Sequence, residues 1–559
     1  MRYAAWLLIV GAVFLSSCQR QPQFDFLIVN ARIVDGTGNP WFFGDVGIRD
    51  DRIAAVGHLK GALARRTIEA NGAVLSPGFI DMLGQSELVL LADPRAMSKI
   101  SQGVTTEITG EGESIAPQND RTRAELKPEA DRYGIAVDWN DLNGYFDRLK
   151  QKGSAVNVGT FVGATQVREY VVGFDDRPAT PAELDQMKQL VRTAMQQGAL
   201  GLSSALVYAP AIYASTAELI GLAREAGSWG GIYITHIRNE RDREMQALYE
   251  ATDIAREAGL PVEVWHLKVA GKQNFGKMSE IVGLINRFRT DGIDITANMY
   301  PYTASAAGLS ACIPAWAHDG GDAKMLQRLR DPASRARIRA DLLNDRTEQE
   351  NFYSGTGADG IMISDVHHPD LKPFEGALLS AIAKEWKKDP IDALMDLLVA
   401  DSARTGAIYF SMSEPDIRIA MAQPWVSFDT DYNAVATDGI LHSGKPHPRA
   451  YGTFARVLAR YVRQENVLTL EEAVRKMTSL PAQRVGLTDR GLVKPGFYAD
   501  LVLFNPAAVQ DRATFADPHQ YSAGIDLVIV NGQPVWDHGT FTGNLPGRPL
   551  RGPGYHRAP

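Results

Sequence analysis

A long alternation of strand-like and helix-like segments occupies residues 77 to about 489 of this 559-residue chain. Short apolar runs, such as residues 230–236, are separated by amphipathic segments, such as residues 180–198. Such an alternation indicates a parallel sheet covered by helices. The eight candidate strands are residues 78–82, 104–109, 156–163, 199–205, 230–236, 261–267, 293–299 and 425–431. Eight such units predict an α/β fold with a closed (β/α)8 TIM barrel.

Both ends of the chain carry similar strand–turn–strand patterns. The run FLIVNARIVDG at residues 26–36 is echoed by LVIVNGQPVWDHG at residues 527–539. Runs rich in Val and Ile that are bounded by Gly, Asn or Asp are typical of strands with tight turns. We therefore expect a small β-sandwich domain built from both termini, residues 24–76 and 490–545. The barrel then spans residues 77–489, with an insertion at about 312–424 that is long enough to be functional.

Residues 1–18 have the features of a secretory signal peptide. One basic residue precedes an apolar run from about Ala4 to Leu15, which is too short to span a bilayer. The ending Leu-Ser-Ser-Cys resembles a bacterial lipobox, which implies a lipidated Cys18 at the mature N-terminus. We expect an exported bacterial lipoprotein, periplasmic or anchored in the outer membrane, that contacts membrane only through the lipid on Cys18. A plain signal peptide with an incidental cysteine is the alternative.

The charge of the chain argues against a nucleic-acid partner. The net charge is −8 and the pI is about 5.8, and both signs are mixed along the sequence. A nucleic-acid-binding domain would carry a basic patch or stripe. Cys312 is the one cysteine besides Cys18, so acylation of Cys18 leaves no disulfide within the mature chain.

Chemically active side chains gather at the predicted ends of the barrel strands, where barrel enzymes place their sites. The fifth strand ends in His236, the sixth in His266 and the eighth in Asp431, and Glu111 and Glu113 follow the second. A lone histidine at a strand end is usually a core residue, but two at neighbouring strands favour a shared role. Two imidazoles and a carboxylate make a three-ligand catalytic metal site that suits zinc or a similar divalent ion.

Longer motifs extend this interpretation over nearly the whole chain after the signal. They are PGFIDM, KISQGVTTEITGEG, GALGLSSALVYAPAIYAST, GGIYITHIRNE, HLKVAG, ANMYPYTAS, GAIYFSMSEPDI and HPRAYGTFARVLARYVR. With these motifs the chain resembles the amidohydrolase superfamily, specifically its N-acyl-D-amino-acid deacylase (D-aminoacylase) branch. The resemblance implies a metal-dependent hydrolase that cleaves the amide C–N bond of small-molecule N-acyl-D-amino acids or related amides bearing a carboxylate.

Two metal-binding positions depart from the family pattern. In the family, a His-x-His pair on the first strand helps to bind one metal, but Leu83 and Gln85 stand here. The second-strand cysteine that helps to bind the other metal in this branch is also missing, because TGNCG reads TGEGE. The resemblance thus implies one Zn²⁺ per chain, held by the two strand-end histidines and a glutamate. We favour Glu111 over Glu113 as that ligand.

Three further residues match functional positions of the family. Asp431 takes the place of the catalytic aspartate, a general base and then a general acid, and Asp438 is a less favoured candidate. Arg449, in HPRAYG, matches the arginine that binds the substrate carboxylate, for which a guanidinium is well shaped. Tyr300, in MYPY, matches a tyrosine that lines the pocket. A surface ion pair for Arg449 and core packing for Tyr300 are the structural alternatives.

Other functions remain compatible with the same sequence. A dipeptidase or a cyclic amidase could use the same barrel. Arg449 discriminates between these enzymes, because it implies a substrate with a free carboxylate. A non-catalytic lipoprotein with a decayed metal site would explain the missing His pair. The retention of His236, His266 and Asp431 argues against decay.

Overall fold

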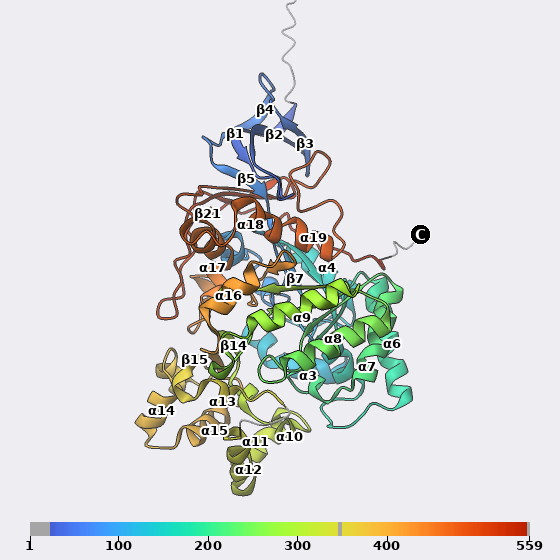
Figure 1. The fold of residues 1–559 in the computed structure, drawn as a ribbon, viewed down its shortest axis with the longest axis vertical. Coiled ribbons are helices and arrows are strands. Elements are labelled where there is room, and N and C mark those ends of the chain that lie inside the picture. Colours follow the sequence, from blue (N-terminus) through green and yellow to red (C-terminus); the bar gives the residue numbers. More distant parts are fainter. Residues whose placement is uncertain (1–22, 345–348, 556–559) are drawn as a thin grey trace, which may run out of the picture.

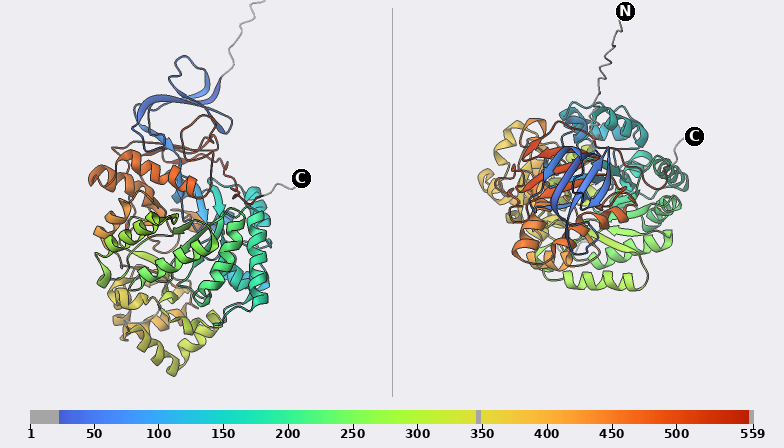
Figure 2. Two further views of the ribbon diagram at one scale, coloured as in Figure 1. Left: turned by 45° about the vertical axis from the view of Figure 1, so that its right-hand side comes forward. Right: turned by 90° about the horizontal axis from the view of Figure 1, so that it is seen from above.

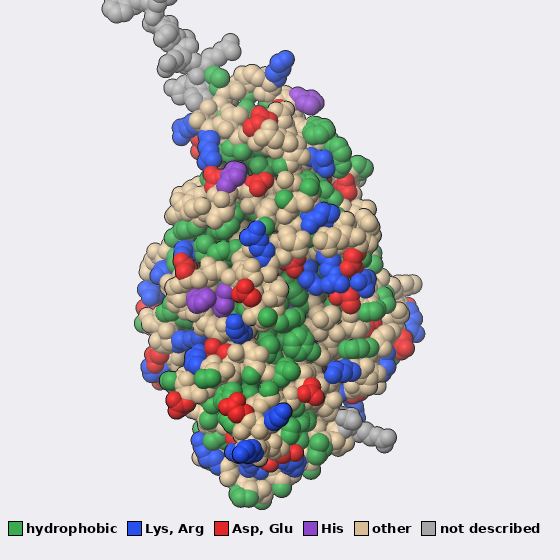
Figure 3. Space-filling view, turned by 90° about the vertical axis from the view of Figure 1, so that its left-hand side faces the viewer, with side chains coloured by type: hydrophobic (Ala, Val, Ile, Leu, Met, Phe, Trp, Pro, Cys, Tyr) green, Lys and Arg blue, Asp and Glu red, His purple; other side chains and the backbone are tan. Residues whose placement is uncertain are grey.

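The computed structural model describes residues 23–344 and 349–555. The predicted signal peptide and Cys18 lie outside the described residues. A β-rich domain lies at one end of the molecule, the barrel lies in the middle, and a mainly helical excursion lies at the other end (Figure 1). Within the described ranges, no helix is both long and apolar enough to cross a membrane. Acidic and basic side chains are mixed over the face seen in Figure 3.

The barrel consists of parallel strands that overlap all eight predicted ones. They are β6 (Phe79–Asp81), β7 (Val104–Thr109), β8 (Asn157–Thr160), β9 (Val162–Gly163), β10 (Gly201–Ala205), β11 (Ile232–His236), β12 (Val262–Val264), β13 (Ile295–Met299) and β17 (Val426–Phe428). Two hydrogen-bonded arcs, β6-β7-β8 and β9-β10-β11-β12-β13-β17, form its wall. A parallel bridge between Gly84 and Tyr432 connects the first strand to the last. The predicted α/β fold class is confirmed.

Helices follow the strands and surround the barrel, as Figures 1 and 2 show. They include α5 (Ala164–Val171), α6 (Pro181–Gln196), α7 (Thr216–Ser228), α8 (Glu244–Ala258), α9 (Met278–Thr290) and α16 (Glu414–Met421). Helix α6 shows why these segments are helical: Thr180 and Glu183 form a capping box around Pro181 at the first turn. Its buried face, which includes Met187 and Val191, packs toward the sheet.

The β-rich domain joins the two ends of the chain in one nine-stranded sheet. Its N-terminal strands are β1 (Phe24–Ile33), β2 (Phe42–Arg49), β3 (Arg52–Gly57), β4 (Ala64–Glu69) and β5 (Val74–Pro77). Its C-terminal strands are β18 (Leu501–Phe504), β19 (Ile525–Val530), β20 (Gln533–Asp537) and β21 (Thr540–Phe541). Strands β5 and β18 pair antiparallel and connect the two halves. The strands from both ends lie together in the view from above in Figure 2.

The excursion between the seventh and eighth barrel strands has a small antiparallel sheet and an apolar core of its own. The sheet consists of β14 (Ser305–Gly308), β15 (Ile361–Asp365) and β16 (Gly406–Tyr409). Its helices are α10 (Ala315–His318), α11 (Asp322–Arg330), α12 (Pro332–Leu342), α13 (Phe352–Thr356), α14 (Leu379–Trp386) and α15 (Pro390–Ala400). Strand β14 borders the cavity at the C-terminal ends of the barrel strands, so the excursion helps to enclose the candidate site.

Candidate active site

Glu111, His236 and His266 meet at the C-terminal mouth of the barrel. Glu111 Oε1 lies 3.1 Å from Nδ1 of His236 and 3.0 Å from Nε2 of His266. Each residue offers one ligand atom, and these atoms lie within 4.8 Å of one another. Within the described residues, no other group of three His, Cys, Asp or Glu side chains comes as close together. The structure thus brings together the three residues predicted as metal ligands.

The loop after β7 determines which glutamate faces the histidines. Gly110 and Gly112 flank Glu111 with φ of +93° and +66°, where side chains other than glycine are disfavoured. A Cβ on Gly112 would also lie 2.7 Å from the backbone nitrogen of Ala205. These two turns direct Glu111 toward the imidazoles, whereas Glu113 lines a neighbouring cavity. Glu111 therefore lies beside both histidines, and Glu113 lies in the neighbouring cavity.

A buried carboxylate behind the histidines, Glu240, was missed from the sequence. Its Oε1 accepts a hydrogen bond from Lys268 Nζ at 2.6 Å and lies 3.1 Å from His266 Nδ1. Its Oε2 lies 3.6 Å from His236 Nε2. Burial opposes ionisation of Glu240, but Lys268 and the two histidines hold its pKa below the usual range. Its position four residues after His236, on the same motif, was the one available signal.

The separations within this cluster fit a divalent metal ion. A tetrahedral zinc ion with ligands at about 2.0–2.1 Å places its ligand atoms about 3.4 Å apart, close to the contacts of Glu111 with the two histidines. Binding through Nε2 of His266 leaves Nδ1 to contacts behind the ring, where Glu240 Oε1 lies at 3.1 Å and Lys268 Nζ at 2.7 Å. Without metal, burial and Lys268 oppose protonation of His266, but Glu240, Asp431 and Glu111 raise its pKa to about 10.

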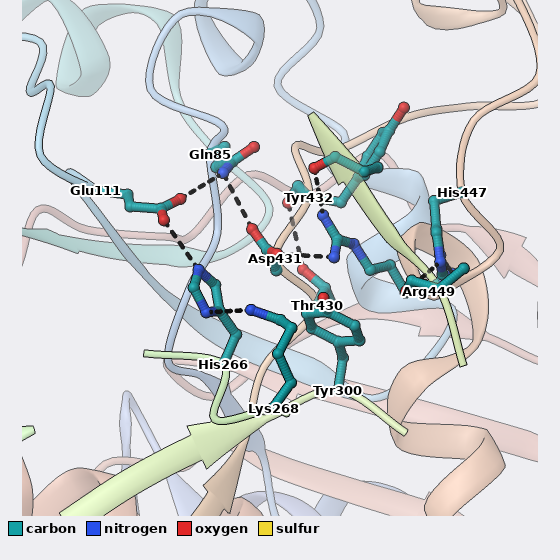
Figure 4. A network of polar contacts seen from close by, with 12 residues as sticks. Gln85, Glu111, His266, Lys268, Tyr300, Thr430, Asp431, Tyr432, His447 and Arg449 are labelled. Carbon is teal, nitrogen blue, oxygen red and sulfur yellow. Dashed lines mark hydrogen bonds and ion pairs between the residues drawn. The ribbon is translucent and has the colours of Figure 1, made fainter. Parts of the chain in front are cut away.

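The two first-strand positions that lack histidine have different surroundings. The Leu83 side chain is fully buried. Gln85 Nε2 donates to Glu111 Oε2 at 2.9 Å and to Asp431 Oδ1 at 3.2 Å. Figure 4 shows Gln85 between these two carboxylates. An amide donor therefore connects the metal-ligand cluster to the predicted catalytic aspartate, a contact that the sequence did not reveal.

A buried lysine fixes the backbone around Asp431. Lys99 Nζ lies 2.8 Å from Asp81 Oδ2 and donates at 2.7 Å to Thr430 Oγ1 and to the carbonyl oxygen of Tyr432. Burial alone would lower the pKa of Lys99, but Asp81 and Glu107 raise it. These bonds hold both neighbours of Asp431, whose φ of +43° is uncommon for a residue with a side chain.

Asp431 lies beside Arg449, the first residue of α17 (Arg449–Arg456). Asp431 Oδ2 is 2.7 Å from Arg449 NH1, but the N–H directions are not aligned for a hydrogen bond. The buried NH1 and Nε donors of Arg449 therefore have no aligned acceptor among the described residues. The guanidinium lies over the Tyr300 ring, 4.3 Å from its centroid, as a cation–π pair. Burial raises the pKa of Asp431, although Arg449 and His266 oppose the shift.

The remaining candidates are separated by their positions. Asp438 pairs with Arg95 at 2.9 Å and does not line the candidate site. Tyr300 does line it, together with the three ligand candidates and Asp431. Lining residues from the barrel and from β14 enclose a cavity of about 220 Å³. This cavity is small and lies beside a larger one, and Gln85 and Tyr208 line both.

Comparison with known proteins places this geometry in a family. The model of the Amidohydrolase family matches residues 388–536. A D-aminoacylase of Alcaligenes xylosoxydans xylosoxydans is 37% identical over 541 residues, which cover 96% of this chain and 99% of the relative. Solved D-aminoacylases, at 36% and 37% identity, superpose with a TM-score of 0.79 over 94% of this chain and 100% of theirs. One of these structures concerns a binuclear metal centre with one-metal activation and second-metal attenuation.

A third solved relative adds information on a bound ligand. It is an N-acyl-D-glutamate deacylase of Bordetella bronchiseptica, 33% identical, with a TM-score of 0.79 over 94% of this chain and 99% of its own. That structure holds zinc and a phosphonate inhibitor that mimics the tetrahedral intermediate. The identity over nearly full length and the shared fold confirm the predicted family. The chain belongs to the amidohydrolase family, in the branch of the D-aminoacylases and N-acyl-D-amino-acid deacylases.

Proposed function

We propose that the protein is a metal-dependent hydrolase of the amide C–N bond of N-acyl-D-amino acids or related amides that bear a free carboxylate. The observation that carries this proposal is the convergence of Glu111, His236 and His266 in one cavity with Asp431. Arg449 lies against this cavity through its contact with Asp431. The activities of the relatives, D-aminoacylase and N-acyl-D-glutamate deacylase, support the substrate class.

One Zn²⁺ per chain is the cofactor that we propose, held by Glu111, His236 and His266. When bound, zinc lowers the pKa of a water molecule and polarises the acyl oxygen. The binding of a single ion is supported by the first strand, because Leu83 has no ligand atom and the Gln85 amide donates to Glu111 and Asp431. It is also consistent with a relative described by one-metal activation.

Asp431 would move the proton that amide hydrolysis requires. The attacking water loses a proton as it adds to the acyl carbon, and the departing nitrogen gains one as the C–N bond breaks. Burial holds the pKa of Asp431 above that of a free aspartate, which makes the carboxylate a better proton acceptor. Its Oδ1 accepts from Gln85, which fixes its orientation toward Glu111 and the histidines.

Arg449 would bind the free carboxylate of the substrate. Its guanidinium pairs with Asp431 at 2.7 Å, but its buried NH1 and Nε donors lack an aligned acceptor among the described residues. A carboxylate can accept two such N–H groups at once. The Tyr300 ring beneath the guanidinium limits its orientations and so pre-positions these donors.

Kinetic comparison of two aspartate variants tests the proposal. We expect the zinc-loaded protein to hydrolyse N-acetyl-D-amino acids, and Asp431→Asn to lower kcat/KM by about 10²–10⁴-fold. The matched control Asp438→Asn changes a nearby carboxylate that pairs with Arg95 outside the site, so it keeps its activity. Equal activity of Asp431→Asn and the unchanged protein would refute the assignment of the catalytic carboxylate. No hydrolysis of any N-acetyl-D- or L-amino acid would refute the proposed function.

We also propose export and lipidation at Cys18, which the apolar run and the Leu-Ser-Ser-Cys ending support. Labelling of bacterial cells with radioactive palmitate tests this proposal. The unchanged chain should incorporate label and partition with membranes, and Cys18→Ala should do neither. Equal labelling of both chains would contradict the proposal.

A further inference from the structure

A second and larger cavity, of about 380 Å³, adjoins the candidate active site. Gln85 and Tyr208 line both cavities, so the two spaces share a wall at the catalytic mouth. The other walls come from the loops after β6, β7 and β10, from α3 (Asp120–Arg132) and α5, and from the start of the excursion. A substrate whose amide lies at the catalytic cluster can thus extend one end into this space.

The lining of this cavity is strongly acidic. Its carboxylates are Glu87, Glu113, Glu125, Glu129, Glu169 and Asp322. Among the described residues that line it there is no lysine or arginine, and burial lowers the pKa of its histidine, His318. Burial raises the pKa of Glu87 and Glu113 to about 7, so this wall is partly ionised at neutral pH. A wall of one charge sign beside a catalytic site concentrates ligands of the opposite sign.

Glu169 shows that these carboxyl groups lack a cationic partner inside the cavity. Its side chain is only 3% exposed, and its Oε1 has no hydrogen-bond partner in the described structure. Burial and the neighbouring Glu113 and Glu125 raise its pKa to about 8, against a smaller opposing effect of Arg121. Burying an ionised carboxylate without a partner is costly, so Glu169 is mostly protonated at neutral pH while the cavity is empty. A cation that entered the cavity would favour the ionised form and supply its missing partner.

The spacing of the carboxylates favours an organic cation over a metal ion. Within the described residues, the one group of three possible ligands within 4.8 Å is that of Glu111 and the two histidines, so the cavity carboxylates lie too far apart to share an ion in this way. Apolar side chains also line the cavity, among them Leu88, Phe174, Ile212 and Ile313. Such a mixture suits an alkyl chain that ends in a positive charge.

We propose that this cavity binds an ammonium or guanidinium group at the end of an alkyl chain of the substrate. The enzyme would then prefer cationic N-acyl amino acids over neutral ones of the same length. This inference rests on the proposed hydrolase function and specifies its substrate. The charge belongs either to the amino-acid side chain or to the acyl group, and both present the same chemistry to the carboxylates.

Two matched pairs of substrates separate these sources. N-acetyl-D-lysine is compared with N-acetyl-D-norleucine, and 6-aminohexanoyl-D-alanine with hexanoyl-D-alanine. We expect kcat/KM of the cationic member to exceed that of the neutral member by about tenfold or more in one pair, which corresponds to 1.4 kcal/mol. The pair that shows the preference identifies the part of the substrate that enters the cavity.

Charge-removing variants connect this preference to the cavity. In the double variant Glu125→Gln/Glu129→Gln, on the wall formed by α3, the cationic-to-neutral ratio should fall toward one. The control Glu257→Gln removes an exposed carboxylate of α8 that does not line the cavity, and the ratio should persist. A ratio that survives in the double variant would overturn the inference.

Failure of this inference is distinguishable from failure of the proposed function. Hydrolysis of the neutral substrates without a cationic preference in either pair overturns the inference and leaves the hydrolase function intact. If all four substrates resist hydrolysis, the proposed function fails, and calorimetric titration with pentylammonium decides on the cavity. Binding that the double variant loses would support a cation site, and absence of binding to the unchanged protein would overturn it.

Discussion

The substitution Glu240→Gln tests how the histidines of the metal site are held. Glu240 Oε1 lies 3.1 Å from His266 Nδ1 and accepts from Lys268 at 2.6 Å. Glutamine keeps the shape and one acceptor oxygen but removes the negative charge. Lys268 Nζ also lies 2.7 Å from His266 Nδ1, so in the variant its ammonium faces the imidazole without a counter-charge.

The expected loss follows from this contact. Removing a buried partner behind a ligand histidine typically costs about 10–100-fold in metal affinity, or roughly 1.4–2.7 kcal/mol. The retained acceptor oxygen of glutamine reduces the loss, and the unpaired Lys268 charge increases it. We therefore expect zinc affinity to fall within this range. Competition of the metal-free protein with a chromophoric zinc chelator measures the affinity directly.

Glu244→Gln is the matched control. Glu244 is also buried, at the start of α8, but burial and the nearby Glu240 raise its pKa well above the usual value. Burial therefore favours the neutral form of this side chain, whose shape glutamine keeps. Zinc affinity of this variant should match that of the unchanged protein. The reasoning is refuted if Glu240→Gln binds zinc within twofold of the unchanged protein, or if Glu244→Gln weakens binding equally.

Three further outcomes follow from contacts of the site and its neighbouring cavity. Arg449→Lys should raise KM about tenfold or more, because an ammonium lacks the paired donors of a guanidinium; an unchanged KM in steady-state assays would contradict this role. Gln85→Leu removes the donor to Glu111 and Asp431 and should lower kcat about tenfold or more, and full activity would show that the bridge is dispensable. The free energy of unfolding should fall from about pH 4.5 to 8, where Glu169 stays protonated in the folded protein and ionises in the unfolded chain. Glu169 contributes on the order of 5 kcal/mol to this fall. In urea unfolding, the free energy of Glu169→Gln should therefore depend less on pH than that of the unchanged protein. An equal pH dependence of the two proteins would refute this role of Glu169.

The fold was predictable because its signals are local. Each barrel strand is a short apolar run between helical segments, and the two terminal hairpins share a pattern that places them in one sheet. The positions of His236 and His266 followed from the same reasoning, because parallel strands present their C-terminal ends at one mouth. Asp431 was favoured over Asp438 by its place at the end of the last strand, and the structure places it in the cavity.

Other features of the site depend on contacts that no spacing in the sequence reveals. Two glycine turns aim the Glu111 side chain at the histidines, whereas Glu113 lies in the neighbouring cavity. The sequence showed that Gln85 replaces a metal-binding histidine of the family. Its hydrogen bonds to Glu111 and Asp431 could not be predicted, because these partners lie 26 and 346 residues away in the sequence. The acidic cavity likewise collects carboxylates from the first-strand loop, from α3 and α5, and from the excursion.

Zinc content per chain is the most direct test of the central claim that Glu111, His236 and His266 bind one metal ion. The zinc-loaded and dialysed protein is measured by inductively coupled plasma mass spectrometry, beside Glu111→Ala, His266→Ala and the control Glu113→Ala. The account predicts about one zinc per chain for the unchanged protein and for Glu113→Ala, and nearly none for the other two variants. Two zinc ions per chain, none at all, or full retention in His266→Ala would contradict it.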